Sequence, residues 1–299
     1  MTYRCRFSAR HLVAVLGLLA LGACGTTEEP YVERPPEDLY NDATAELDQE
    51  NYGKAAALFD EVERQHPYSA WATQAQLMSA FSYYQVNKYD DAIIALDRFI
   101  ELHPGHSSIA YAYYLKALCY YEQIVDVGRD QNNTEKAFEA MSEVVQRFPN
   151  TDYARDAKLK IDLARDHLAG KEMEVGRFYL DRGFYLAAIN RFRRVIDKFQ
   201  VTTHVPEALH RLVECYLALG VIDEAQANAA VLGYNFPGST WYQYSYQLLA
   251  DAGVAGSATA PAETVSEPEV VAPPDADVVA PPPPAEEVPA DEAPLSTIF

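Results

Sequence analysis

An internal repeat constrains this sequence more than any other feature. Alanines recur at intervals of 37, 45, 51 and 37 residues, at Ala55, Ala92, Ala137, Ala188 and Ala225. Twelve residues after them stand Pro67, Pro104, Pro149, Gln200 and Pro237. Apolar side chains four and seven residues after each alanine complete one helix face, and a helix must end before a proline. This spacing predicts stacked helical units.

A second helix precedes each of these in the pattern. Twelve residues before the alanine a small residue stands in three units, at Ala43, Ala80 and Gly176. The combined pattern resembles the tetratricopeptide repeat. We therefore predict an all-α superhelix of five tetratricopeptide-like helix pairs over residues 38–252, in which stacking supplies the core that no pair can bury alone.

The two longer intervals predict two departures from a regular repeat. The interval of 45 contains a polar stretch near residues 128–133, which we interpret as a loop insertion. The interval of 51 contains a long helical run from Tyr153 to about Arg182. We expect one elongated helix there.

The N-terminal region is typical of a targeting segment and not of a folded domain. Residues 1–11 hold three arginines, and residues 12–21 are an apolar run of ten, about half of the ~20 residues that span a bilayer. The run ends in Leu-Gly-Ala before Cys24, which resembles the bacterial lipobox. This resemblance implies a cleaved lipoprotein signal peptide over residues 1–23 and acylation of Cys24. Because Gly25 rather than an aspartate follows, it also implies the outer membrane, with the chain facing the periplasm.

Two further segments lack helical periodicity. Residues 24–37 are rich in acids and prolines and read as an extended tether. Residues 253–299 hold ten prolines, nine acidic residues and no basic residue, which predicts a disordered tail. The formal net charge of the chain is −20, which argues against a nucleic-acid partner.

No pattern in the sequence indicates catalysis. There is no glycine-rich phosphate loop and no nucleophile motif. His103 and His106 lie close together, but no constellation of Cys or carboxylate side chains surrounds them. We predict no enzyme activity, no metal and no cofactor, and we expect Cys119 and Cys215 to be separately buried thiols.

The first helices of pairs one to three are rich in aromatic residues. Helices in these positions line the concave side of a repeat superhelix, and a tyrosine combines an apolar ring with one hydrogen-bonding group. The predicted peptide groove comprises Tyr40, Phe81, Tyr84, Tyr111, Tyr114 and Tyr121. Ordinary packing between helices is the alternative for any one of these rings.

Basic residues concentrate around the fourth pair. Residues 153–199 hold eleven Lys/Arg and seven Asp/Glu, although the chain as a whole is acidic. Arginine forks pair with carboxylates at protein interfaces, so this block is a candidate partner surface. A solvated helix face is the alternative. The partner-binding residues that we predict are Arg182, Arg191 and Arg194.

Residues 179–192, with the sequence YLDRGFYLAAINRF, resemble the Y-x-x-R-G-x-x-x-A-x-x-x-R segment of the BamD family. This resemblance extends from residue 24 to about 250. It implies a lipoprotein of the outer-membrane β-barrel assembly machinery that contacts a POTRA domain of BamA through the region of Arg182 and Arg191. It also implies contacts with other assembly lipoproteins and with unfolded outer-membrane proteins, whose C-terminal targeting strand the N-terminal pairs would receive. A periplasmic tetratricopeptide scaffold for cell-wall synthesis or division is the alternative function.

Overall fold

The computed structural model describes residues 33–255 of the 299-residue chain. Over these residues the backbone forms eleven α-helices and no strand. In chain order they are α2 (Pro36–Asp48), α3 (Tyr52–Gln65), α4 (Ala70–Gln85), α5 (Tyr89–Leu102), α6 (Ile109–Tyr121), α7 (Asn132–Arg147), α8 (Asp152–Asp181), α9 (Tyr185–Lys198), α10 (Val205–Ala218), α11 (Ile222–Asn235) and α12 (Thr240–Asp251). The predicted all-α class is confirmed.

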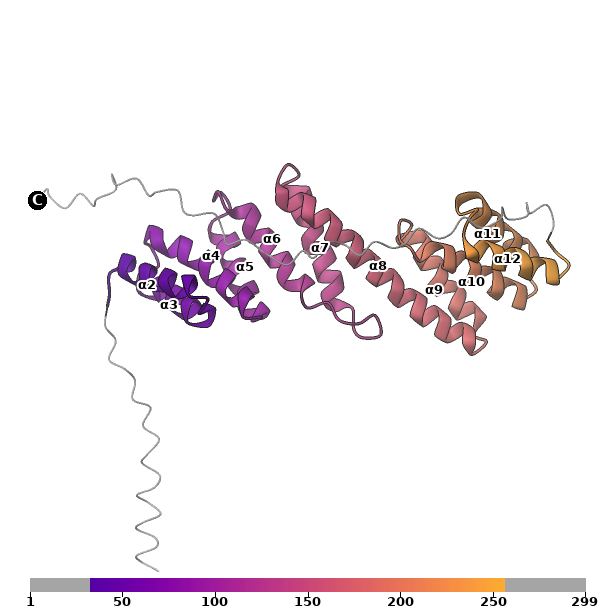
Figure 1. The fold of residues 1–299 in the computed structure, drawn as a ribbon, viewed down its shortest axis with the longest axis horizontal. Coiled ribbons are helices and arrows are strands. Elements are labelled where there is room, and N and C mark those ends of the chain that lie inside the picture. The colour runs from indigo at the N-terminus through magenta and orange to yellow at the C-terminus, as the bar shows by residue number, and fades with distance from the viewer. Residues whose placement is uncertain (1–32, 256–299) are drawn as a thin grey trace, which may run out of the picture. The chain divides into compact units, whose positions relative to one another are not determined.

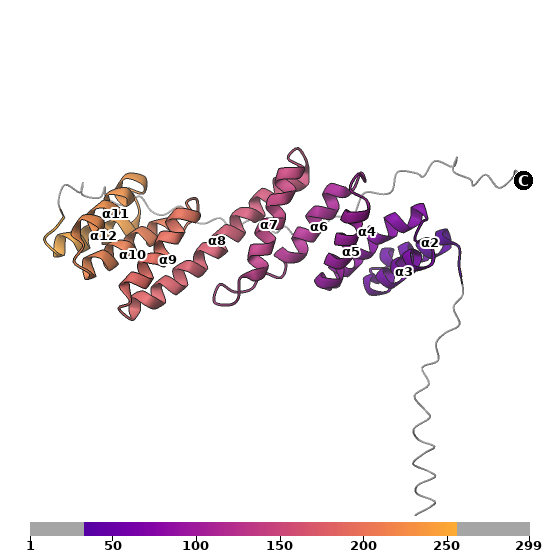
Figure 2. The same cartoon turned by 180° about the vertical axis from the view of Figure 1, so that it is seen from behind.

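The helices form five pairs that stack in chain order. The pairs are α2 with α3, α4 with α5, α6 with α7, α8 with α9, and α10 with α11. The second helix of each pair also packs against the first helix of the next: α3 against α4, α5 against α6, α7 against α8 and α9 against α10. Contacts also join the first helices of neighbouring pairs, α2 to α4, α4 to α6 and α6 to α8. Figures 1 and 2 show the succession from both sides.

The repeated positions form the core of each pair. All five repeat alanines are completely buried. The side chains four and seven residues later are buried as well: Phe59, Leu96, Met141, Phe192, Ala229, Val62, Phe99, Val144, Val195 and Leu232. Removing a large apolar side chain from water stabilises the fold by about 1.5–3 kcal/mol. The predicted repeat register is therefore confirmed in every pair.

A left-handed backbone residue makes the turn within four of the five pairs. It stands five positions before the repeat alanine, with φ of 60° at Glu50, 59° at Asn87, 75° at Gly183 and 73° at Gly220. Glycine adopts this conformation without the steric cost of a Cβ atom. In the fourth pair this turn residue is Gly183, which directly follows Arg182 at the end of the long helix.

The third pair replaces this turn with a longer connection, over residues 122–131. The predicted loop at 128–133 is therefore in the right place with the wrong bounds, since α7 already begins at Asn132. The buried Gln131 explains the boundary, because its Nε2 donates to the carbonyls of Asp126 (3.1 Å) and Arg129 (3.2 Å) and fixes the loop before the helix starts. The long helix predicted from Tyr153 to about Arg182 is confirmed as α8.

One helix lies beyond the five predicted pairs. Helix α12 packs against α10 and α11 and buries Tyr242 and Leu249 in the C-terminal core. After it, the carbonyl of Val254 accepts a hydrogen bond of 2.7 Å from Gln226. A repeat array needs such a terminal helix to cover its last apolar face. The predicted signal peptide, Cys24, residues 24–32 of the predicted tether and the predicted tail from residue 256 lie outside the described residues. The predicted end of the tether at residue 37 is wrong, since α2 already begins at Pro36.

Candidate functional site

The predicted peptide groove divides into core and surface residues. Phe81 and Tyr111 are only 4% and 2% exposed. Phe81 packs edge-on against Tyr52 of α3, and Tyr111 packs against Tyr153 of α8. Tyr40 of α2 contacts Phe59 of α3 and Trp71 of α4. Neighbouring helices cover these rings, so Phe81 and Tyr111 are core residues here and cannot line a surface groove.

Tyr84, Tyr114 and Tyr121 remain half-buried, on helices α4 and α6, and we name them the aromatic surface. The hydroxyl of Tyr114 donates to Asp156 of α8 at 2.5 Å, and that of Tyr84 lies 3.5 Å from Glu122. The ammonium of Lys160 lies 5.0 Å from the centre of the Tyr121 ring. Burial, assisted by the facing carboxylates, raises the pKa of both Tyr84 and Tyr114, which keeps their hydroxyls as donors.

The structure brings together two of the three predicted arginines. Arg191 and Arg194 lie on α9 and both contact Glu172 of α8, at 3.1 Å and 2.7 Å. Glu172 is largely buried beneath them, while the two guanidiniums stay partly open to solvent. One carboxylate shared by two guanidiniums leaves an excess of positive charge and several unused N–H donors on this face.

Arg182 lies apart from that pair, at the turn between α8 and α9. Its guanidinium lies over the ring of Phe178, 3.5 Å from the ring centre, and it donates to the Phe178 carbonyl at 3.3 Å. Phe178, Phe184 and Leu186 are 49%, 59% and 70% exposed around it. We name these four residues the hairpin-tip surface. Exposed apolar residues gathered around an arginine are typical of protein–protein contact sites.

Sequence reasoning missed the apolar members of the hairpin-tip surface. Phe178 and Phe184 flank the turn residues at which the two helices reverse, so a helical period assigns them no clear side. The sequence feature that could have revealed them is the dipeptide Arg182-Gly183. A left-handed glycine there ends α8 and turns the side chain of the next residue outward.

Another part of the basic block serves the fold. Arg177 of α8 donates to both oxygens of Glu207 of α10, at 3.0 Å each. Arg211 reaches the same Glu207 at 3.3 Å and Glu214 at 2.9 Å. The contact of Arg177 ties the fourth pair to the fifth, whereas the contacts of Arg211 lie within α10. The number of basic residues in the sequence is therefore larger than the number whose charge a partner could contact.

Two histidine clusters lack the geometry of a catalytic site. His210 contacts the hydroxyl of Ser245 (2.8 Å) and the carboxylate of Glu214 (3.5 Å), but Ser245 is completely buried, so no substrate reaches its oxygen. His103 and His106 both pack against Phe99. Over residues 33–255, no group of three or more His, Cys, Asp or Glu side chains is arranged to hold a metal ion.

One observation concerns whether a helix of the described region could cross a membrane. Among residues 33–255, no helix combines the length and the apolar character that crossing a bilayer requires. Even α8, with 30 residues, carries charged side chains along its length.

Comparison with known proteins gives the family. The model of the family YfiO, described as an outer membrane lipoprotein, matches residues 32–232. The outer membrane protein assembly factor BamD of Caulobacter vibrioides is 52% identical over 255 residues, which cover 83% of this chain and 84% of that protein. This chain belongs to the BamD family. Two other BamD proteins are similar at 49% identity (Rickettsia prowazekii) and 36% identity (Neisseria meningitidis serogroup A), each covering 79% of this chain and 94% of its relative.

The comparison with solved structures gave matches with TM-scores below 0.5. The TPR2AB-domain:pHSP90 complex of yeast Sti1 gives a TM-score of 0.38 at 12% identity, over 73% of this chain and 84% of that one. The protein TTC0263 of Thermus thermophilus gives 0.34 at 18% identity, over 72% of this chain and all of that one.

Proposed function

We propose that this protein is a non-enzymatic lipoprotein subunit of the outer-membrane β-barrel assembly machinery. Membership of the BamD family supports this proposal, since its relatives are named outer membrane protein assembly factors. The acylated Cys24 holds the chain on the outer membrane, facing the periplasm. Two or more acyl chains suffice for stable anchoring, at about 0.8 kcal/mol for each buried CH₂ group.

The fourth helix pair binds a BamA-like barrel protein through its POTRA domain. The observation that supports this assignment is that α8 and α9 carry both unused guanidinium donors and exposed apolar side chains. Arg191 and Arg194 present unused donors over Glu172, and the hairpin-tip surface adds exposed apolar area around Arg182. A partner with carboxylates beside an apolar patch would bury both kinds of group. Other assembly lipoproteins bind elsewhere on the array.

The N-terminal pairs receive the C-terminal targeting strand of unfolded outer-membrane proteins. The aromatic surface supports this role, because Tyr84, Tyr114 and Tyr121 keep part of each ring exposed next to one another on α4 and α6. Such a strand commonly ends in an aromatic residue. Aromatic pairs contribute about 0.5–1.5 kcal/mol beyond the area that they bury.

Replacing Arg191 tests the partner surface. Arg191→Glu removes the ion pair with Glu172 and places a carboxylate where the partner's acid would lie. We expect co-purified BamA-like protein to fall at least about tenfold, which corresponds to a loss of roughly 1.4 kcal/mol. Arg155→Glu is the matched control, because Arg155 is an exposed residue of α8 whose ion pair among residues 33–255 is with the exposed Asp152.

Far-UV circular dichroism must show that the helices of both variants are intact. Unchanged recovery of the BamA-like protein with Arg191→Glu would contradict the assignment of α9. Recovery of cell-wall or division enzymes in place of barrel-assembly proteins would support the alternative scaffold and overturn the proposed function.

The aromatic surface needs a separate test with a barrel-derived C-terminal peptide. Tyr84→Ala combined with Tyr114→Ala removes two partly exposed rings. We expect the dissociation constant to rise by about tenfold, from about 0.5–1.5 kcal/mol for each lost aromatic pair. Tyr234→Ala, at an exposed tyrosine of α11, is the control. An equal dissociation constant for the double variant and the control would assign these tyrosines to packing alone.

A further inference from the structure

The hairpin-tip surface carries a cation without an acidic partner. Within residues 33–255, Arg182 forms no ion pair, and its guanidinium donates to the carbonyl of Phe178 alone. A guanidinium has five N–H donors, so most of those on Arg182 remain open. The rings of Phe178 and Phe184 both lie edge-on to Tyr179, with ring centres 5.7 Å and 6.5 Å away, and form one apolar cluster beside this charge. A segment that binds here needs a carboxylate next to apolar side chains.

The positive charge continues along α9. Residues 178–198 hold five basic and two acidic residues, a formal net charge of +3. Arg193 and Lys198 are exposed and form no ion pair in the described part of the chain, and Arg194 keeps 47% of its side chain exposed beside Glu172. The complete surface is therefore apolar at the turn and basic along α9.

One segment of this chain, outside the described residues, has the complementary pattern. We name residues 286–299 the acidic segment, because its first half contains Glu286, Glu287, Asp291 and Glu292. Its second half contains the apolar residues Leu295, Ile298 and Phe299. Carboxylates form short, often bidentate hydrogen bonds with guanidiniums, and covering exposed apolar side chains removes them from water. The order of the two halves lets the acidic residues lie along α9 while the apolar residues cover the hairpin-tip surface.

The connection between the described chain and the acidic segment is long enough to reach this surface. Successive helices of the stack reverse direction, so α8, α10 and α12 run the same way. His204 lies 3.5 Å from Asp166 of α8, and His210 of α10 lies 2.8 Å from Ser245 of α12, which puts the ends of these helices at one edge of the array. With helices about 10 Å apart, that edge leaves roughly 20–30 Å to cross. The 30 residues 256–285 reach at most about 100 Å, and a random coil of that length averages about 30 Å.

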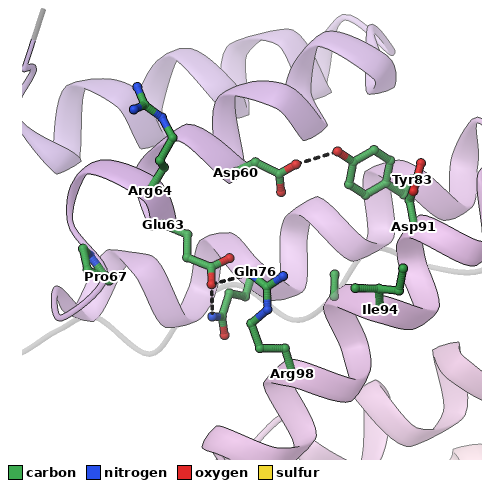
Figure 3. Close-up of a pocket in the computed structure, with 10 residues that line it drawn as sticks. Asp60, Glu63, Arg64, Pro67, Gln76, Tyr83, Asp91, Ile94 and Arg98 are labelled. Carbon is green, nitrogen blue, oxygen red and sulfur yellow. Dashed lines mark hydrogen bonds and ion pairs between the residues drawn. The ribbon is translucent and has the colours of Figure 1, made fainter. Parts of the chain in front are cut away.

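The N-terminal pairs suit the acidic segment less well. Residues 36–121 hold thirteen acidic and five basic residues, a formal net charge of −8. A pocket of about 430 Å³ opens there between α3, α4 and α5 (Figure 3). Its charged lining side chains are Asp60, Glu63, Asp91, Arg64 and Arg98. Carboxylates outnumber guanidiniums in this pocket, and Arg98 is already paired with Glu63 at 2.7 Å, so the pocket repels an acidic segment.

We propose that the acidic segment of the same chain binds the hairpin-tip surface and α9, and that it competes there with the barrel protein. Its carboxylates pair with Arg182 and with the guanidiniums of α9, and its apolar side chains cover the exposed rings. A connection whose average length matches the span gives an effective concentration on the order of 1 mM. A contact with a Kd of about 0.1 mM for the separate peptide is then occupied about nine-tenths of the time. The competition rests on the proposed function, whereas the contact itself does not.

Crosslinking from residue 299 of the purified full chain tests the contact in the absence of any partner. The photoreactive p-benzoylphenylalanine replaces Phe299, the protein is irradiated, and mass spectrometry locates the crosslinked residues. We expect most intramolecular crosslinks to fall within residues 178–198. Arg182→Gln should lower their yield at least about threefold. Arg155→Gln is the control, because Arg155 is also an exposed arginine of α8 but lies at the opposite end of that helix.

Two charge variants of the full chain test the acidic residues. The first variant combines Glu286→Gln, Glu287→Gln, Asp291→Asn and Glu292→Gln. The second combines Glu263→Gln, Glu267→Gln, Glu269→Gln and Asp275→Asn. Both lose four negative charges and differ only in position. The first should lower the crosslinking yield and raise the recovery of BamA-like protein, each at least about threefold, and the second should change neither.

Four outcomes count against the proposal. Crosslinks that are spread over the array, or gathered on the aromatic surface, exclude this binding site. Equal losses of yield in the two charge variants reduce the effect to general attraction between acidic and basic regions. Crosslinks found only between isotope-labelled and unlabelled copies place the segment on a second molecule. A lower yield with unchanged recovery of BamA-like protein refutes the competition, whereas normal crosslinking in a chain that binds no BamA-like protein refutes the proposed function and leaves the contact in place.

Discussion

Gly176 marks a place where α8 and α9 approach too closely for a side chain. It stands twelve residues before the repeat alanine Ala188, where Ala43 and Ala80 stand in other pairs. A Cβ atom on Gly176 would lie 2.4 Å from Cε1 of Phe192 and 2.8 Å from two other atoms of that ring. Phe192 is completely buried, so its ring can move only by disturbing the core around it.

This geometry sets the expected effect of Gly176→Ala. Overpacking of a filled core costs about 1–3 kcal/mol. Replacing a glycine by alanine within a helix raises the free energy of unfolding by about 0.5–1 kcal/mol. Because three ring atoms lie closer than any ordinary Cβ contact, we take the upper part of the first range. The free energy of unfolding should fall by about 1–2 kcal/mol.

Gly53→Ala provides the matched control, since Gly53 lies in α3 with no atom within 4 Å of its added Cβ. It should leave stability unchanged or raise it by up to about 1 kcal/mol. Urea unfolding is followed by far-UV circular dichroism and by tryptophan fluorescence, to which Trp71 and Trp241 both contribute. If Phe192→Leu is added to Gly176→Ala, the combined loss should be smaller than the sum of the two single losses. A Gly176→Ala protein as stable as Gly53→Ala would refute the close approach.

Two further predictions concern buried thiols and an ion pair. Burial raises the pKa of Cys215 to about 12 and also raises the pKa of Cys119. In a chain whose two N-terminal cysteines are replaced by serine, we therefore expect neither thiol to react with a disulfide reagent until denaturant is added. Rapid reaction of the native protein would contradict this. The pKa of Asp166 is lowered, because the hydrogen bond from His204 outweighs the effect of burial. The pair therefore stabilises the fold above the unfolded pKa of about 3.9, and this stabilisation is lost as the pH falls. Asp166→Asn should lower the free energy of unfolding by about 0.5–1 kcal/mol near pH 6 and by less near pH 3, as measured by urea unfolding; a deficit that is constant over this range would refute the assignment.

The fold was largely predictable because one short pattern recurs. The distance from Ala55 to Pro67 returns in four of five units, and the apolar residues between them fix which side of each helix is buried. Features that occur once escaped the pattern. Helix α12 has no repeat partner in the sequence, and only its contact with α10 and α11 reveals its role. The bounds of the α6–α7 loop depend on hydrogen bonds from Gln131, which no period contains.

The candidate sites were less predictable, because exposure depends on which helix lies opposite. Phe81 and Tyr84 belong to the same aromatic set in the sequence, but Tyr52 covers the first and leaves the second half-open. Similarly, Tyr111 is covered by Tyr153, which lies one whole pair further along the chain. A helical period gives the direction of each side chain on its own helix. It does not give the position of the neighbouring helix.

Crosslinking at the hairpin-tip surface tests the central claim, that α8 and α9 bind the barrel protein of the assembly machinery. A photoreactive amino acid replaces Leu186, which is 70% exposed, and in a second protein it replaces Val231 on α11 as a control for exposure alone. After irradiation of intact cells, mass spectrometry identifies the captured chains. We expect the protein labelled at Leu186 to capture a POTRA domain of a BamA-like protein and the protein labelled at Val231 to capture none. Capture of other proteins at Leu186, with none of the barrel protein, would contradict it.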